Sequence, residues 1–448
     1  MADEKRFDHI DIWVAGTEEP EFQPTDEGAQ EISATESDPR LDEQYGRVVD
    51  DDYMFDDEVA EEERVVVNIG PQHPSTHGVL RLQVELEGEV IRRTKPIIGY
   101  LHTGMEKTAE KLTFAQGPTN VTRMDYLSPF HGELAYSLAV ERLLGIEVPP
   151  RAAAIRVLMT ELNRITSHLV ALATGGMDIG AVSMMIYGFR ERESILAFFE
   201  KTTGLRMNHN YIRPGGVAAD LPPGWKDDVA AILADMPGRI REYDDLLQFN
   251  PIWMARTKGV GVITAEEAIA YSITGPPLRS TGVDWDLRKV FPYSGIEQYE
   301  FDVVTAENGD VYDRYRIRVE EITESLKIVS QVMDTMPGGD YRVADRKVTP
   351  PPRARIDESM EALIHHFKLF TEGFKVPEGE TYVAVESPRG ELGCYLVSDG
   401  GAHPYRMHTR APSFYNLQGL PIAMADSLMA DTIATIASLD PVMGDVDR

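Results

Sequence analysis

Two histidines, His73 and His77, stand four residues apart in the segment 70–78, whose prolines and glycines exclude a helix. Apolar residues before this segment, and in alternation at 80–86 after it, predict a strand on each side, so the segment forms a loop. An imidazole titrates close to physiological pH, and such a loop could therefore donate or accept a proton or bind a ligand. The same spacing is half of a zinc site, and a loop histidine can simply bond to its own backbone, so spacing alone leaves these alternatives open.

Three further residues could take part in such chemistry: Asp125 and Tyr126, in a polar and aromatic segment, and Asp178, which lies between glycines near a predicted helix end. A carboxylate beside a histidine raises the pKa of the imidazole and fixes its tautomer. A tyrosine hydroxyl can donate to a carbonyl oxygen and then give up its proton. A helix cap for Asp178 and a core tyrosine for Tyr126 explain these two residues at least as well.

The helices that must position these residues are predicted by apolar residues at helical spacing. Pro149–Pro150 suits the start of one helix and Gly175–Gly176 its end. Two more helices are predicted over about 183–203 and 310–336. Helices of this number and apolarity form the core of a bundle.

β structure is predicted again near the C-terminus. Residues 381–386 and 392–397 predict a hairpin around the turn Ser387–Gly390, and residues 405–410 alternate like a further strand. We therefore expect an α+β fold, in which a helical bundle carries small β units at its N- and C-terminal parts.

The composition limits the classes of function. The chain of 448 residues has a net charge of −30, which argues against nucleic-acid binding because phosphate contacts need a basic face. Its single cysteine, Cys394, excludes a disulfide framework and a thiolate metal cage within the chain. No apolar run is long enough for a membrane span and no signal peptide is present, so we expect a cytoplasmic protein that reaches a membrane only through partners.

The negative charge is concentrated near the N-terminus. Nineteen Asp and Glu residues between Glu18 and Glu63 face only Arg40 and Arg47. With few apolar residues among them, segment 1–62 is expected to be a disordered or partner-docking extension, or a solvating tail.

Eight motifs identify a family. In chain order they are GPQHPSTHGVLRL, LHTGMEK, TRMDYLSP, ELNRITSHL, YIRPGGV, GDVYDRY, ESPRGELG and SLDPVMGDVDR. Together they resemble the D subunit of bacterial respiratory complex I, which forms the quinone site of NADH-quinone oxidoreductase, from about Arg64 to Arg448. The resemblance implies one domain over 63–448, with a β unit at 63–105, a helical bundle at 106–345 and a β/α part at 346–448.

That family in turn resembles the large subunit of nickel-iron hydrogenases, and the fold is expected to be similar. Hydrogenases hold their metal with two Cys-x-x-Cys pairs. The matching positions here are Asp125 and Ser128, and Val442 and Asp445. Because such a metal site requires thiolates, hydrogenase activity is excluded and no metal is expected. The family uses the emptied cavity for the quinone headgroup.

The resemblance assigns roles to residues by position. His77 and Tyr126 are expected to hydrogen-bond to the two quinone carbonyl oxygens, and Asp178 is the expected partner of His77. His73 shapes the same loop. The remaining residues expected to line the cavity are Asp125, Asp440 and Val442.

Two positions depart from the pattern of many relatives, both next to an iron–sulfur cluster of the neighbouring subunit. Thr103 stands where many relatives have arginine, although threonine also occurs in bacterial members. The cluster-adjacent histidine of the family falls at Asn208, with His209 one place later. Either His209 takes over that role, or the pH-linked tuning of the cluster is absent.

The implied function is quinone reduction within a multisubunit, proton-translocating NADH:quinone oxidoreductase. The chain would bind no cofactor itself, take ubiquinone or menaquinone as substrate, and receive electrons from a cluster in the iron–sulfur B subunit. Its other implied partners are the C and I subunits and the membrane-embedded H subunit, at the cytoplasmic face of the inner membrane. A related complex with a donor other than NADH, or a hydrogenase-derived scaffold without catalysis, are the alternatives.

Overall fold

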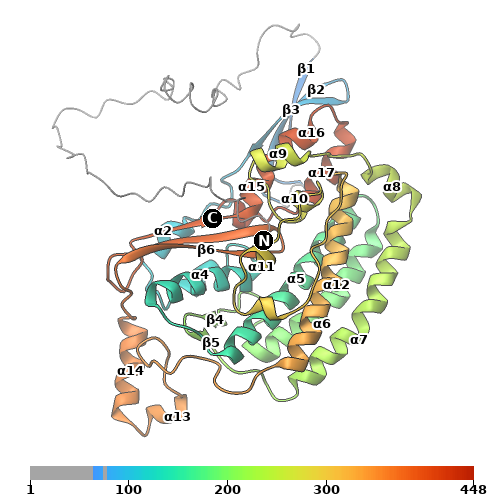
Figure 1. Cartoon of the computed structure of the whole chain (residues 1–448). Coiled ribbons are helices and arrows are strands. Elements are labelled where there is room, and N and C mark those ends of the chain that lie inside the picture. The colour runs from blue at the N-terminus through green and yellow to red at the C-terminus, as the bar shows by residue number, and fades with distance from the viewer. Residues whose placement is uncertain (1–63, 74–77) are drawn as a thin grey trace, which may run out of the picture. The chain divides into compact units, whose positions relative to one another are not determined.

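The computed structural model describes residues 64–73 and 78–448, so the acidic segment 1–62 and the predicted proton donor His77 lie outside the described residues. The described part combines helices with three antiparallel sheets, which confirms the α+β class (Figure 1). No helix within it is long and apolar enough to cross a membrane. The domain division at residues 62 and 63 stays a prediction.

The N-terminal sheet is the β unit that the sequence predicts around the histidine loop. Its strands follow one another in the order β1 (Arg64–Ile69), β2 (Arg81–Glu87) and β3 (Val90–Ile97). Leu80, Leu82 and Val84 alternate along one face and are fully buried. They share an apolar core with α16 (Leu420–Met424) and α17 (Thr432–Leu439), so the end of the chain packs against its first sheet.

Five helices of 16 or more residues form the helical body of the described part. They are α4 (Pro129–Leu144), α5 (Pro150–Asp178), α6 (Val182–Thr203), α7 (Trp225–Tyr243) and α12 (Val311–Thr335). Helices α5, α6, α7 and α12 run side by side (Figure 1). The two helices predicted over 183–203 and 310–336 are confirmed as α6 and α12, and the Asp310 carboxylate caps α12 by accepting from the Asp313 backbone N–H at 2.8 Å.

The predicted end of α5 at Gly175–Gly176 is wrong, because the helix continues to Asp178. Here Gly176 serves close packing, and neither glycine ends the helix. A Cβ added at Gly176 would lie 2.8 Å from the Cβ of Met184 on α6, and one added at Gly175 would lie 3.9 Å from the Cβ of Ala437 on α17. The helix start is as predicted, with Pro150 in the first turn.

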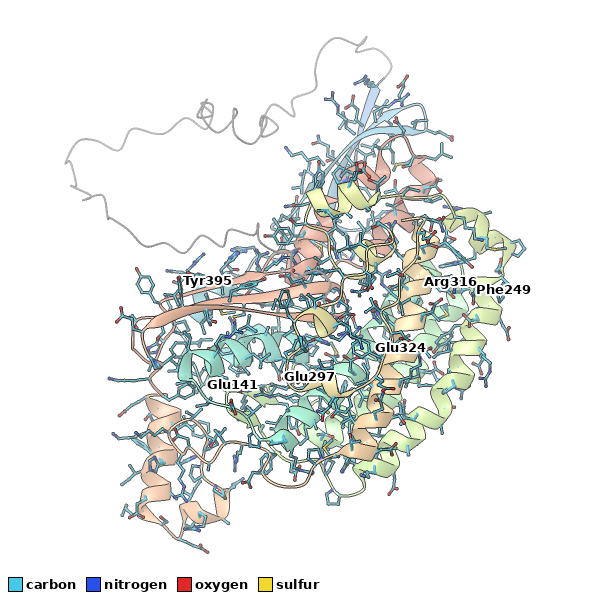
Figure 2. The ribbon with its side chains drawn as sticks, viewed as in Figure 1. Glu141, Phe249, Glu297, Arg316, Glu324 and Tyr395 are labelled. Carbon is cyan, nitrogen blue, oxygen red and sulfur yellow. The ribbon has the colours of Figure 1, made fainter. Side chains whose placement is uncertain are left out.

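Buried ion pairs join the helices as well. Arg156 of α5 donates to both carboxylate oxygens of Glu141 on α4, at 3.0 and 2.5 Å (Glu141 is labelled in Figure 2). Neither side chain is exposed by more than 6%. Because a buried charge is costly unless it is paired, this pair fixes α4 against α5.

The predicted C-terminal hairpin is confirmed as β6 (Gly379–Ser387) and β7 (Gly390–Ser398), and β8 (Arg406–Arg410) pairs with β7. This sheet packs on α4. The turn of the hairpin carries Arg389 into the interior, where the side chain is fully buried.

The remaining elements are short. Before α12 they are α2 (Met105–Ala109), α3 (Gly117–Val121), β4 (Ile212–Arg213), β5 (Gly216–Val217), the π-helix η2 (Asp244–Gln248), α8 (Pro251–Thr257), α9 (Ala265–Ala270), α10 (Pro276–Arg279), α11 (Leu287–Val290) and the 3-10 helix η3 (Ile296–Gln298). After it come α13 (Arg353–Ile356), α14 (Met360–Thr371), α15 (Pro412–Gln418), the 3-10 helix η4 (Met429–Asp431) and α18 (Met443–Val446).

Candidate functional site

Tyr126 lies half-buried in the segment between α3 and α4. Its ring packs against Gly444 of α18, where an added Cβ would lie 3.0 and 3.1 Å from two ring carbons and 2.5 Å from the carbonyl oxygen of Met124. A side chain at position 444 would collide with this segment. The final residues of the chain therefore form one wall around Tyr126.

Asp125 organises the segment locally. Its Oδ1 accepts from the backbone N–H groups of Leu127 and Ser128, at 3.2 and 3.1 Å, and its Oδ2 accepts from the Ser128 hydroxyl. This turn leads directly into α4, which begins at Pro129. Asp125 itself is only 3% exposed, so its charge needs a partner.

Arg389 is that partner, and the motifs of the sequence gave it no role of its own. Its Nη1 donates to both oxygens of Asp125, at 2.9 and 3.2 Å, and to Ser167 Oγ at 3.0 Å. Its Nε donates to the backbone carbonyl of Asp440 at 3.0 Å, and its Nη2 lies 3.1 Å from Asp440 Oδ2. The one signal was an arginine inside the ESPRGELG motif, at the turn of the predicted hairpin.

Asp440 belongs to the same cluster, and Val442 lies two residues after it. Asp440 ends α17 in a left-handed conformation, with φ of 51°, and so turns the chain toward α18. Val442 is buried and its backbone N–H donates to Ser413 Oγ at 3.4 Å. The structure thus brings together three of the predicted residues, Asp125, Tyr126 and Asp440, around Arg389, while Val442 follows two residues after Asp440.

The electrostatics keep the Tyr126 hydroxyl protonated. Burial raises the pKa of Tyr126, the charges of Asp125 and Asp440 raise it further, and Arg389 opposes them. In the same wall, burial and the charge of Asp125 raise the pKa of Asp445 to about 6, although the Ser413 backbone N–H donates to its Oδ2 at 3.0 Å.

Asp178 is the last residue of α5, and burial raises the pKa of its carboxyl to about 6. The charge of His73 acts in the opposite direction and lowers that pKa, which places the exposed His73 close enough to Asp178 to act on it. The predicted pairing of Asp178 with His77 stays a prediction, since His77 is outside the described residues. The end of α5 also contacts α17, where Gly175 lies near Ala437, three residues before Asp440.

The two residues predicted beside a neighbouring cluster have different surroundings. Thr103 is exposed in the segment between β3 and α2, where the neighbouring backbone N–H groups of Gly99 and Leu101 both donate to the Asp447 carboxylate at 2.8 Å. His209 is buried, and its ring stacks on Phe130 with centroids 4.1 Å apart and planes 8° apart. Their positions relative to a cluster stay predictions.

His209 is held as a neutral ring. Its Nδ1 lies 3.0 Å from the carbonyl oxygen of Leu205, an acceptor, so Nδ1 carries the proton. Burial lowers the pKa of His209 to about 4. Asn208, which precedes it, adopts a left-handed conformation with φ of 54°.

Over residues 64–73 and 78–448, no group of three or more His, Cys, Asp or Glu side chains is placed to hold a metal ion. Cys394 is buried in β7. The chemistry available around Tyr126 is hydrogen bonding and proton transfer by a hydroxyl supported by buried charges.

Comparisons with known proteins agree on one family. The family described as "Respiratory-chain NADH dehydrogenase, 49 Kd subunit" matches residues 178–448. The NADH-quinone oxidoreductase D 1 subunit of Salinispora arenicola (strain CNS-205) is 56% identical over 405 residues, which cover 86% of this chain and 92% of the relative. The NADH-quinone oxidoreductase D subunit of Mycobacterium sp. (strain KMS) is 57% identical over 404 residues, which cover 86% of this chain and 91% of the relative. The NADH-quinone oxidoreductase D subunit of Rhodococcus jostii (strain RHA1) is 56% identical over 405 residues, which cover 86% of this chain and 92% of the relative.

Proposed function

The chain belongs to the family of the 49 kDa subunit of respiratory-chain NADH dehydrogenase, and we infer that it is a subunit of an NADH-quinone oxidoreductase and contributes to its quinone-reduction module. Within that module we propose that the cluster around Tyr126 binds the quinone headgroup. The observation that carries this proposal is that Arg389 holds both Asp125 and Asp440, the two carboxylates whose charges act on the half-buried Tyr126.

Reduction of a quinone to a quinol takes two electrons and two protons. The electrons come from an iron–sulfur cluster of a neighbouring subunit, since such a cluster is held by several thiolates and this chain has a single cysteine. Tyr126 donates a hydrogen bond to one carbonyl oxygen, and His77 donates to the other. As the electrons arrive, each carbonyl oxygen becomes basic and takes the proton of its donor, and the tyrosinate and imidazole are then reprotonated from solvent.

The raised pKa of Tyr126 fits this order of events. A phenol with an unperturbed pKa of about 10 does not ionise near neutral pH, and burial beside Asp125 makes ionisation harder still. The hydroxyl therefore stays a donor to the oxidised quinone and releases its proton only to the reduced form. Asp178 orients the protonated His77 through a charge-assisted hydrogen bond.

The finer assignments rest on the family resemblance. We propose that the helical body has the fold of the hydrogenase large subunit, and that the partners are the iron–sulfur B subunit, the C and I subunits and the membrane-embedded H subunit. The protein would then be peripheral, at the cytoplasmic face of the inner membrane, with quinone reduction coupled to proton translocation. Exposed apolar side chains, such as Phe249 at 70% and Ile252 at 71%, suit a chain covered by other subunits (Phe249 is labelled in Figure 2).

Replacing Tyr126 by phenylalanine tests the proposal, because it removes only the hydroxyl. We expect quinone reduction in membranes to fall about 100-fold, as for loss of a general acid, while NADH oxidation by an artificial acceptor is unchanged. The matched control is Tyr395→Phe in β7, whose hydroxyl bonds to Glu380 at the surface (Figure 2). Parental quinone rates in the Tyr126→Phe enzyme would refute the role of Tyr126.

A further inference from the structure

A small hollow lies where helices α5, α8, α12 and α17 meet, and none of the residues proposed to bind quinone lines it. Its volume is about 30 Å³. Since a hollow needs about 10–15 Å³ to hold one water molecule, only about one or two non-hydrogen atoms fit here. The hollow therefore suits a monatomic ion or water and is too small for an organic molecule.

Three residues that line the hollow carry buried polar atoms without a partner. These atoms are Trp253 Nε1, Tyr315 Oη and Arg318 Nε, and none of them forms a hydrogen bond within residues 64–73 and 78–448. Each of the three residues is at most 6% exposed. The rings of Trp253 and Tyr315 pack edge to face with centroids 5.2 Å apart, so the two side chains are held together. Because buried polar groups are normally paired, these three indicate a ligand.

The three unpaired groups are hydrogen-bond donors. The indole N–H of Trp253 and the Nε–H of Arg318 can only donate, and the hydroxyl of Tyr315 can donate as well. A water molecule accepts through two lone pairs only, whereas a halide ion accepts from any direction. Three converging donors therefore favour an anion over water.

The charge beside the hollow is positive. Arg318 and Arg314, one turn earlier on α12, are both buried, and neither forms an ion pair with a carboxylate in the described part of the chain. Arg314 donates to the carbonyl oxygens of Gly309 and Gly261, at 2.8 and 2.6 Å. Its Nε donates to Ser438 Oγ at 3.0 Å, and Arg318 Nη1 donates to the Arg314 carbonyl at 3.3 Å. These partners are neutral, so they do not compensate the two charges.

The carboxylates that act on Arg318 from a distance are paired with other cations. Arg389 Nη2 lies 3.1 Å from Asp440 Oδ2, and Arg279 Nη2 lies 2.6 Å from Glu321 Oε1. Burial lowers the pKa of Arg318, and Asp440 and Glu321 oppose this effect only in part.

Arg314 is in the same situation. Burial and then the charge of Arg318 lower the pKa of Arg314 to about 9, although Asp310 and Asp313 act in the opposite direction. Both of these carboxylates accept hydrogen bonds from backbone N–H groups at 2.8 Å. An anion beside the two arginines would favour their charged forms and so remove this cost.

We propose that the hollow binds chloride, held by Arg318 Nε, Trp253 Nε1 and Tyr315 Oη. The ion compensates the charge of Arg318 and joins α8 to α12. The volume of the hollow excludes the larger phosphate and sulfate ions. This site does not depend on the proposed role of Tyr126 in quinone reduction.

Thermal unfolding of the full-length chain tests the proposal. The midpoint is measured in sodium chloride and in sodium gluconate, whose anion is too large for the hollow, at one constant ionic strength. A ligand that binds only the folded protein raises the midpoint as its concentration rises. We expect the midpoint to rise as chloride replaces gluconate, and the dependence gives the dissociation constant of chloride.

Two variants remove one donor each. We expect Arg318→Gln to raise the dissociation constant of chloride at least about tenfold, as for loss of a charged hydrogen-bonding group. Tyr315→Phe should raise it about fivefold, as for loss of one neutral hydrogen bond. Because Tyr315→Phe removes only a hydroxyl, it provides the test even if Arg318→Gln does not fold.

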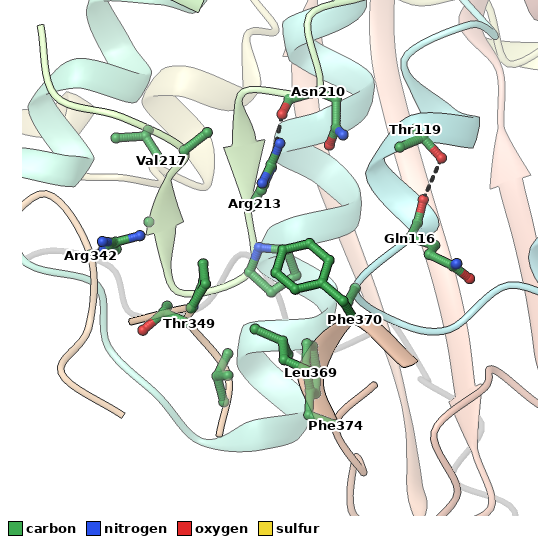
Figure 3. A pocket seen from close by; sticks show the side chains of 16 residues that line it. Gln116, Thr119, Asn210, Arg213, Val217, Arg342, Thr349, Leu369, Phe370 and Phe374 are labelled. Atoms are coloured by element: carbon green, nitrogen blue, oxygen red, sulfur yellow. Dashed lines mark hydrogen bonds between the residues drawn. The ribbon is translucent and has the colours of Figure 1, made fainter. Parts of the chain in front are cut away.

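Two matched controls should keep the parental dissociation constant. Tyr312→Phe, on the same helix, removes a hydroxyl that donates to the Gln248 carbonyl at 3.1 Å, outside the hollow. Arg342→Gln makes the same change of net charge as Arg318→Gln, at a separate hollow of about 190 Å³ (Figure 3). Equal midpoints in chloride and gluconate would show that no chloride binds, and would overturn the proposal. Parental chloride dissociation constants in Tyr315→Phe and in folded Arg318→Gln would overturn it as well.

Discussion

Arg389 Nη1 lies 2.9 Å from Asp125 Oδ2, joining a hairpin turn to a segment 264 residues earlier in the chain. The same guanidinium reaches Asp440 through Nε and Nη2. One buried side chain thus connects both segments that surround Tyr126. Its loss would affect the position of a hydroxyl that it does not itself contact.

The first prediction is that Arg389→Gln destabilises the protein. The substitution leaves Asp125 and Asp440 buried without their cation, and breaking such an arrangement costs about 3–5 kcal/mol. Arg389→Lys should lower the free energy of unfolding by less, because lysine keeps the charge although it lacks the planar guanidinium group. Chemical denaturation of the full-length chain measures the free energy of unfolding of both variants.

A surface arginine provides the control for that experiment. Arg406→Gln breaks an exposed pair with Glu110 at 3.1 Å, which should change the free energy of unfolding by less than about 1 kcal/mol. Equal effects of the Arg389 and Arg406 variants would contradict a structural clamp at Arg389.

The second prediction concerns the wall around Tyr126. In Gly444→Ala the new methyl group meets the Met124 carbonyl at 2.5 Å and the Tyr126 ring at 3.0 Å, so the tyrosine must move. Overpacking of this kind costs about 1–3 kcal/mol, and we expect KM for quinone to rise as well. Steady-state kinetics with quinone, and with an artificial acceptor as reference, show whether the defect is confined to the quinone step.

Gly338→Ala is the matched control, since a Cβ there meets nothing within 4 Å. It should leave both KM and stability unchanged. A Gly444→Ala enzyme with parental KM would show that Tyr126 does not depend on the C-terminal wall.

The sequence was sufficient for elements whose signals are local. Helix α12 follows from apolar residues at helical spacing after the Asp310 cap, and the hairpin β6–β7 follows from two apolar runs around a proline turn. The end of α5 was misjudged because Gly175 and Gly176 have two possible uses. Only the position of α6 shows that Gly176 permits close packing.

The candidate site was only partly predictable for a related reason. Tyr126 and Asp125 are chemically conspicuous in a short polar segment. Arg389 acquires its role from partners 264 and 51 residues away, and sequence does not reveal which guanidinium will be fully buried. The nearness of His73 to Asp178 depends likewise on how a loop of the first sheet meets the end of α5.

The third prediction is that His209 does not tune a neighbouring cluster near neutral pH. Because burial lowers its pKa to about 4, the ring is neutral throughout pH 6–8.5 and exchanges no proton there. His209→Phe, which keeps an aromatic ring on Phe130, should leave the pH dependence of the cluster midpoint potential unchanged. Redox titrations followed by electron paramagnetic resonance measure it, and a changed slope over this range would refute the prediction.

The last prediction tests how Asp178 acts on the histidine loop. Its pKa of about 6 means that the carboxyl is ionised at pH 8 and becomes protonated as the pH falls through 6. An ionised carboxylate raises the pKa of a histidine that it pairs with, so Asp178→Asn should lower the pKa of His77. The high-pH decline of quinone reduction, which reflects loss of the His77 proton, should then occur at lower pH than in the parent.

The variant His73→Gln separates the effect of His73 on the pH profile from the effect of His77. The charge of His73 lowers the pKa of Asp178, so its removal should raise that pKa above 6 and move the low-pH decline of quinone reduction to higher pH. In Asp178→Asn the low-pH decline should disappear, because no carboxyl remains to be protonated. Oxidation of NADH by an artificial acceptor, recorded over the same pH range, must show none of these shifts. An Asp178→Asn profile that coincides with the parent at both ends would exclude Asp178 from the proton chemistry of the site.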